Sequence, residues 1–229
     1  MTSDTPPPVQ PPTVEPPVIP WERPGAPFGS SLIDTIKLFV TNPGEAFRQV
    51  PVNSELIKPI LYAVIIGVVG SFAEWIYQTL FGGITNSLIP SPDTGSDMEG
   101  FAFAQGLGFL GVVLAIFIIP IALFIGSGIQ HLVLMVVGGN NKGYMATFRA
   151  ACYSSGTSSL ASLVPICGSF VGLFWGIFLA IVGLAELQNI SKGKAALAVL
   201  LPVLLICICA GIGFALFAGS MAAIMGAEG

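Results

Sequence analysis

Long apolar stretches dominate the chain from about residue 59 to residue 220. A transmembrane helix needs about 20 consecutive apolar residues to cross roughly 30 Å of hydrocarbon. Five stretches approach or exceed that length: residues 59–81, 101–137, 146–164, 167–187 and 196–220. The pattern predicts an all-α integral membrane protein, in which a five-helix transmembrane bundle occupies residues 59–220.

The second stretch, residues 101–137, is longer than one crossing requires. As one helix it would extend about 55 Å, whereas two crossings would leave only about 17 residues for each and almost none for a turn. Pro120 can kink a transmembrane helix without ending it. We therefore expect one crossing here, made by a single kinked helix or by a helix followed by a surface segment.

The distribution of charge supports one crossing in this stretch. All the basic residues then fall on the same side of the membrane: Arg23, Lys37, Arg48, Lys58, Lys142, Arg149, Lys192 and Lys194. The other side receives only acidic residues: Asp93, Asp97, Glu99 and Glu228. Because Lys and Arg accumulate in cytoplasmic loops, the sequence predicts five spans with the N-terminus inside and the C-terminus outside.

The N-terminal part divides into two segments. Residues 1–27 are rich in proline and lack apolar periodicity, which predicts a disordered, extended cytosolic tail that acts as a plain tether. Residues 28–58 are predicted to form short amphipathic helices on the membrane surface. The apolar positions of the first helix are Leu32, Ile33, Ile36, Phe39 and Val40, with Asp34, Thr35 and Lys37 opposite.

Two local patterns mark the edges of these segments. Asn42 is suited to cap a second short helix, with Pro43 at its first position and Glu45 three residues after the cap. At the other end of the chain, residues 221–229 are predicted to form a short outer tail.

Composition excludes several classes of protein. Hydrophobic residues make up 54% of the chain and charged residues 9%, against about 25% charged residues in a typical soluble domain. A chain with so little charge cannot cover a surface that faces water. An ordinary soluble protein, a wholly disordered chain and a disulfide-rich secreted scaffold are therefore excluded.

The sequence carries no motif for catalysis. His131 is the only histidine, so a zinc site lacks ligands, and neither a phosphate-binding loop nor a dinucleotide-binding loop is present. The cysteines are predicted to be free packing residues: Cys152, Cys167, Cys207 and Cys209. We expect no enzymatic activity, no cofactor, no metal and no nucleic-acid partner.

Four polar residues are candidate functional sites. Glu74 lies inside the first span, where a carboxylate is a functional hypothesis by default; a position at the outer interface beside Trp75 and Tyr77 is the favoured alternative. For His131, a structural polar contact is favoured over a pH sensor. Arg149 and Glu186 lie at inner ends of spans, where we expect them to be interfacial and to pair with each other.

Small and hydroxylic residues indicate close packing of the last three spans. The third span contains Ser154, Ser155, Thr157, Ser158, Ser159 and Ser162, which favours burial in the bundle over the lining of a hydrated cavity. The fourth span carries small residues in steps of four, namely Gly168, Gly172, Gly176 and Ala180. The fifth span repeats this pattern with Gly211, Ala215 and Gly219, so we expect a tight bundle.

Several segments in a fixed order resemble a known family. They are residues 41–47 (Thr-Asn-Pro-Gly-Glu-Ala-Phe), 126–139 with His131-Leu132, 148–154, 163–168 through Trp175-Gly176, 183–186 and 194–196. In this order they resemble the YIP-domain family of Ypt/Rab-interacting multispanning membrane proteins, in its prokaryotic branch. The resemblance covers about residues 28–220 and implies five spans with a cytosolic N-terminus. Eukaryotic members act in vesicle traffic and bind small GTPases, but the proline-rich tail here has no recognisable segment for that contact.

The sequence thus predicts a non-enzymatic membrane organiser or partner-binding scaffold in a prokaryotic cytoplasmic membrane, with a function of the trafficking type. A partner would bind through the charged inner segments, which are residues 28–50, 138–149 and 188–195. The alternative is a small transporter or channel subunit that uses Glu74, His131 and the hydroxyl-rich third span. The alternative requires these three features to meet at one cavity.

Overall fold

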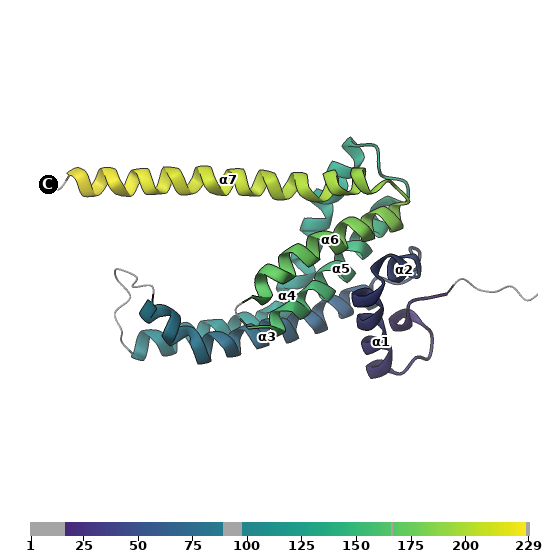
Figure 1. The fold of residues 1–229 in the computed structure, drawn as a ribbon, viewed down its shortest axis with the longest axis horizontal. Coiled ribbons are helices and arrows are strands. Elements are labelled where there is room, and N and C mark those ends of the chain that lie inside the picture. The colour runs from purple at the N-terminus through teal and green to yellow at the C-terminus, as the bar shows by residue number, and fades with distance from the viewer. Residues whose placement is uncertain (1–16, 89–97, 166, 228–229) are drawn as a thin grey trace, which may run out of the picture.

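The computed structural model describes residues 17–88, 98–165 and 167–227, and in this part of the chain the elements are helices. Figure 1 shows long helices that alternate in direction, with two short helices at one end. The elements are η1 (Pro20–Glu22), α1 (Phe28–Thr41), α2 (Pro43–Arg48), α3 (Ile57–Leu88), α4 (Met98–Val136), α5 (Gly143–Ser159), η2 (Leu160–Leu163), α6 (Gly168–Gln188) and α7 (Lys192–Ala227). Residues 1–16 of the predicted tail, the acidic segment 89–97 and residues 228–229 lie outside the described residues.

Four of the predicted spans coincide with helices that are long and apolar enough to cross a membrane. These candidate spans are Ile57–Phe81, Gln105–Val136, Gly168–Gln188 and Lys192–Ser220, in α3, α4, α6 and α7. The predicted third span, residues 146–164, corresponds to α5, η2 and one following residue. With 17 residues and many hydroxyl groups, α5 does not reach the same length and apolarity.

The long second stretch is one helix. α4 continues through Pro120 to Val136, and α7 likewise continues through Pro202. A proline inside a helix removes one backbone hydrogen bond, and transmembrane helices tolerate this loss where neighbouring groups satisfy the freed carbonyl. The structure therefore favours the kinked single helix over a helix with a separate surface segment.

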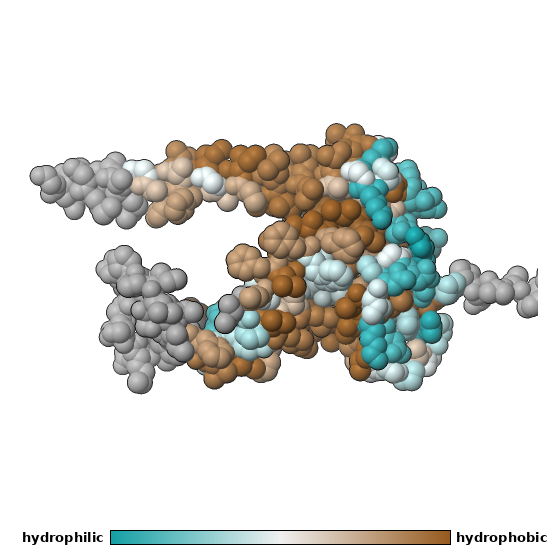
Figure 2. Space-filling view, in the orientation of Figure 1, coloured by the Kyte–Doolittle hydropathy of each residue, from teal (hydrophilic) through white to brown (hydrophobic). Residues whose placement is uncertain are grey.

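The surface divides sharply by hydropathy (Figure 2). Hydrophilic residues gather at the end of the molecule that holds α1, α2 and the α4–α5 and α6–α7 connections, and hydrophobic residues predominate on the described surface of the long helices. We call the hydrophilic region the polar end. At this end α2 starts as predicted, because the Asn42 side chain accepts a hydrogen bond from the Glu45 amide at 3.3 Å and Pro43 is the first helical residue.

The N-terminal tail was expected to extend to residue 27, and that boundary is wrong. Residues 17–23, which we call the strap, fold back onto α1, with Ile19 and Trp21 only 0% and 5% exposed. The Trp21 amide donates to Thr35 Oγ1 at 2.9 Å, so Thr35 of the predicted polar face is buried beneath the strap, whereas Asp34 and Lys37 remain exposed. The periodicity of α1 could not reveal this, because the covering segment lies outside the helix.

The buried core lies beside the polar end rather than midway along the long helices. α2 packs on α6 through Phe47, which is fully buried and meets Phe39 edge to face with ring centroids 4.8 Å apart. A Cβ added at Gly183 of α6 would lie 2.6 Å from the Phe47 ring. This glycine therefore permits the close approach of α2 to α6.

The far part of α7 leaves the bundle. α7 packs against α4 and α6 near its start, but every described side chain from Val203 to Ser220 is exposed. Gly211 and Gly219 have no neighbouring atom within 4 Å of an added Cβ. The expected tight packing of the fifth span is thus wrong for this structure, because the small residues lie beyond the point where α7 diverges.

A Gly183→Ala substitution should destabilise the protein. The added methyl group meets the Phe47 ring, which cannot swing away because Phe39 encloses it, and overpacking of this kind costs about 1–3 kcal/mol. We expect the midpoint of thermal unfolding in detergent to fall by about 3 °C or more. Gly211→Ala is the matched control, since it adds the same atom to open space and improves helix propensity. An equal effect of the two changes would contradict this account of the α2–α6 contact.

Candidate functional site

Arg149 of α5 is the most deeply buried charged residue in the described part of the polar end. Its side chain is 0% exposed and its Nη1 donates to Glu22 Oε1 of the strap at 2.6 Å. The Nη2 group donates to the backbone oxygens of Ser54 and Glu55, both at 2.7 Å, and to Ser54 Oγ at 2.6 Å. Arg149 was expected to pair with Glu186, and that pairing is wrong, because the guanidinium meets Glu22 and Glu186 meets Arg48.

Glu22 receives three hydrogen bonds from side chains on two other segments. In addition to Arg149, the Tyr153 hydroxyl donates to Glu22 Oε1 and the Ser54 hydroxyl donates to Glu22 Oε2, each at 2.6 Å. The Glu22 side chain is only 3% exposed. Buried charges are tolerated when they are paired and hydrogen-bonded. The Glu22 carboxylate is thus held at the polar end by specific hydrogen bonds. The sequence analysis did not identify Glu22, because it lies among prolines in the predicted tail.

An aromatic cluster adjoins this ion pair. Tyr153 stacks on Phe39 of α1 with ring centroids 5.2 Å apart, and it lies 4.9 Å from Tyr62 of α3. Trp21 of the strap lies 6.4 Å from Tyr62, and its Nε1 donates to the Lys58 carbonyl at 2.7 Å. Three helices and the strap therefore converge on one buried cluster.

Glu186 pairs with a different arginine. Arg48 of α2 donates from Nε and Nη2 to the two oxygens of the Glu186 carboxylate, each at 3.0 Å. The hydrogen bond to Glu186 and the charge of that carboxylate raise the pKa of Arg48 above its ordinary value. This bidentate pair ties α2 to the end of α6 at the solvent-exposed surface.

Gln188, the last residue of α6, joins this end of α6 to the α4–α5 connection. Its side chain is 0% exposed, and its Oε1 accepts from the amides of Asn141 and Lys142 at 3.1 and 2.8 Å. Its Nε2 donates to the Gly143 carbonyl at 2.7 Å and to Thr147 Oγ1 at 2.9 Å. Sequence reasoning missed this residue, although an amide at the end of an apolar helix was a usable signal.

His131 belongs to the same network. Its Nδ1 lies 3.0 Å from Thr147 Oγ1, and its ring meets Tyr144 edge to face at 5.5 Å. The residue is buried, and its neighbours link α4 to α5. The arrangement supplies His131 with a structural polar contact.

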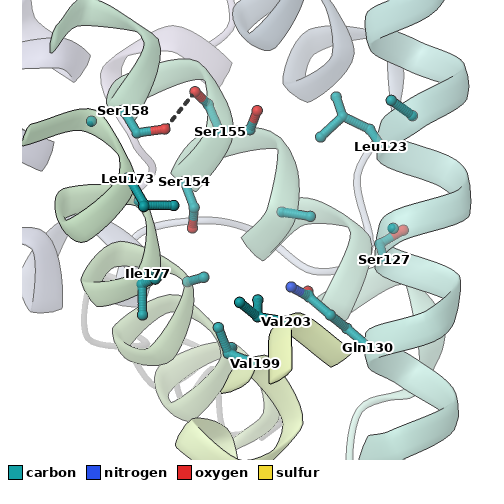
Figure 3. A pocket seen from close by; sticks show the side chains of 16 residues that line it. Leu123, Ser127, Gln130, Ser154, Ser155, Ser158, Leu173, Ile177, Val199 and Val203 are labelled. Atoms are coloured by element: carbon teal, nitrogen blue, oxygen red, sulfur yellow. Dashed lines mark hydrogen bonds between the residues drawn. The ribbon is translucent and has the colours of Figure 1, made fainter. Parts of the chain in front are cut away.

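Glu74 lies away from these groups. It is exposed on the surface of α3, and it is not among the residues that line the hollow between the helices. That hollow, of about 330 Å³, lies between α4, α5, α6 and α7. Figure 3 shows the polar residues around it, which include Gln130, Ser154, Ser155 and Ser158. Neither Glu74 nor His131 lines the hollow, so the three features of the transporter hypothesis do not meet.

The predicted packing residues of α6 face the preceding segment. An added Cβ would lie within 3.2 Å of Ala161 or Ser158 atoms at each of three positions, Gly168, Gly172 and Gly176. Ala180 lines the hollow. α5 and η2 therefore approach α6 closely, and hydroxyls of α5 divide between buried contacts and the wall of the hollow.

The described residues hold no group of three side chains that could bind a metal ion. Their cysteines are unpaired thiols, and of the four only Cys152 is buried.

Comparison with known proteins gives one family. Residues 36–225 match the Yip1 domain. Neither the curated proteins nor the solved structures gave a match. The matched region includes the C-terminal part of α1, all of α2 to α6 and most of α7, and with them Arg149, Tyr153 and Gln188, whereas the strap lies outside it. Since the match covers most of the chain and the apolar helices agree with it, the protein is a multi-pass integral membrane protein that belongs to the Yip1 domain family.

Proposed function

We propose that the protein is a non-enzymatic membrane organiser that acts as a scaffold, in a role of the trafficking type, and binds a protein partner at its polar end. The observation that carries this proposal is the Gln188 network, which joins segments 138–149 and 188–195 into one surface. Lys194 adds a second link, because its Nζ donates to the Gly138 carbonyl at 2.9 Å. A surface held in one shape loses little conformational entropy when a partner binds.

This surface offers polar and basic groups to a partner. Asn140, Lys142, Ser191 and Lys192 are exposed, and α2 is joined to the same end of α6 by Arg48 and Glu186. Residues 28–50 extend the surface along the polar end, where exposed apolar side chains of α1, namely Phe28, Ile33 and Val40, suit the membrane interface. The surface would therefore face a cytosolic or membrane-associated protein beside the lipid headgroups.

We further propose five crossings of a prokaryotic cytoplasmic membrane, with the N-terminus inside and the C-terminus outside. α5 and η2 together extend roughly 33 Å, which is enough to cross the hydrocarbon. α5 packs against α3, α4 and α6, so most of its surface need not be apolar to lie at membrane depth. α3, α5 and α7 all begin at the polar end. Because α7 is the last helix and runs away from that end, the chain would cross the membrane an odd number of times.

Reporter fusions should test this topology. A reporter that is active only outside the cytosol should be active when fused after residue 229 and inactive when fused after Lys142, because α5, α6 and α7 add three crossings between the two points. The same fusion after Asn189 should be inactive and serves as the control for the inner loops. Activity at Lys142, or inactivity at residue 229, would contradict five crossings.

Substitution of exposed lysines should weaken partner binding. We expect Lys142→Ser together with Lys192→Ser to lower the recovery of cross-linked partner proteins from native membranes by about tenfold, because an exposed charged contact contributes on the order of 0.5–1 kcal/mol. Gln78→Ala, an exposed position in the part of α3 remote from its start at Ile57, is the matched control. Unchanged recovery with the double variant would reject this surface as the docking site.

Transport should be absent. Proteoliposomes that contain the wild type or Glu74→Gln should show no flux of protons or small cations above empty liposomes, because neither Glu74 nor His131 lines the hollow. A wild-type flux that disappears in Glu74→Gln would overturn the scaffold proposal in favour of a transporter or channel subunit.

A further inference from the structure

The strap is held to the rest of the protein by a few side chains. Ile19, Trp21 and the Glu22 carboxylate are buried, whereas residues 17 and 23 at its two ends are exposed. Its connection to α1 is the short linker 24–27, in which Gly25 adopts a φ of 72°. The strap thus resembles a short peptide ligand that is bound in a site formed by other elements of the chain.

The aromatic part of that site is built without the strap. Phe39, Tyr62 and Tyr153 come from three different helices, and their ring centroids are 4.9 to 6.1 Å apart. The Tyr62 hydroxyl is fixed by a 2.8 Å hydrogen bond with Thr157 Oγ1 of α5. Trp21 therefore packs beside a cluster whose members already hold one another in place.

The polar part of the site binds a carboxylate. Arg149, Tyr153 and Ser54 direct three donors to the two oxygens of Glu22. The backbone carbonyls of Ser54 and Glu55 fix the guanidinium independently of the strap. Glu22 engages only one nitrogen of Arg149, and the buried Nε has no hydrogen-bond partner among the described residues. A different carboxylate ligand thus has one unused donor available.

The buried position of Arg149 determines how the strap can leave. When a buried ion pair loses one partner, the remaining charge stays buried without compensation, and this destabilises the protein strongly. Departure of the strap is therefore favourable only when another carboxylate takes the place of Glu22. Replacement by an incoming ligand, rather than simple opening, follows from this geometry.

We infer that residues 17–23 are an internal ligand covering a docking site for a segment of a partner protein, in which an aromatic residue is followed directly by an acidic one. The inference rests on the proposed function in that the polar end binds proteins, but it concerns a different site from the exposed lysines. The site lies within the matched family region and the strap lies outside it, so ligand and site are separable parts of the chain.

Peptide binding to the full-length protein tests this inference. The probe is a fluorescently labelled peptide with the sequence of residues 17–25, and binding is measured by anisotropy in detergent micelles. We expect Glu22→Gln protein to bind it at least about tenfold more tightly than the wild type, because the tethered strap of the wild type competes at high effective concentration. A peptide with glutamine in place of its glutamate should bind neither protein.

A control variant and a cleavable chain complete the peptide-binding experiment. Asp34→Asn removes an exposed carboxylate from α1 and should bind the peptide like the wild type. If Glu22→Gln fails to fold, a wild-type chain with a protease site inserted between Gly25 and Ala26 replaces it. After cleavage, excess labelled peptide should exchange for the severed strap, while the uncut chain should not take it up.

Distinct results would overturn the inference. Absence of peptide binding to both the Glu22→Gln and the cleaved protein would make the strap a fixed structural element. If inorganic phosphate or anionic phospholipid displaces the peptide, the site binds a phosphate group rather than a segment of a partner protein. If the wild type is a dimer that dissociates on the Glu22→Gln substitution, the occupant of the site is the strap of a second copy rather than a partner protein. The lysine variants described above leave this site intact, so failure of the proposed docking surface and failure of this inference are distinguishable.

Discussion

The buried ion pair of Arg149 and Glu22 is the constraint on which the polar end depends. Removal of one partner from such a pair costs on the order of 3–5 kcal/mol, because the other charge remains buried without compensation. Here the pair also joins the strap, the segment before α3 and α5, since Ser54 and Tyr153 share the same carboxylate. The positions of these three segments are consequently coupled through one charge.

The same requirement for satisfied polar groups explains the rest of this end. Burial of an amide without hydrogen bonds costs about 1–3 kcal/mol, and Gln188 avoids that cost through four bonds to the α4–α5 connection and α5. The hydrogen bonds of Gln188 also hold the α4–α5 connection in one conformation. By contrast, the described side chains of residues 203–220 of α7 are exposed and mostly apolar, and they make no such bonds with the bundle. Specific polar contacts therefore hold the polar end together, while lipid is the expected neighbour of the exposed apolar surface.

The predictable parts of the fold are those that local sequence controls. The start of α2 follows from Asn42, Pro43 and Glu45, because a cap and its helix are separated by only a few residues. Length and charge together predicted one crossing in residues 101–137 but left open whether a surface segment follows the helix, and the structure has one continuous helix there. The partners of Arg149 and Glu186 were not predictable in this way, because each lies more than 100 residues away in the chain. Glu22 left one signal, which is that Trp21 beside it is the only aromatic residue among residues 1–27.

By itself the sequence determined that this is a helical, multi-pass membrane protein of the Yip1 domain family, with its charges concentrated beside the membrane. Apolar length and scarcity of charge are sums over a segment, so they can be read without knowledge of what the segment touches. Only the tertiary structure decided which charges meet. It placed the strap over α1, turned Thr35 inward, paired Arg149 with Glu22 and left Glu74 and His131 outside the hollow that hydroxyls of α5 line. The physical reason is that pairing in a buried environment depends on which distant segments come into contact, and the local pattern of hydrophobic and polar residues carries no record of that contact.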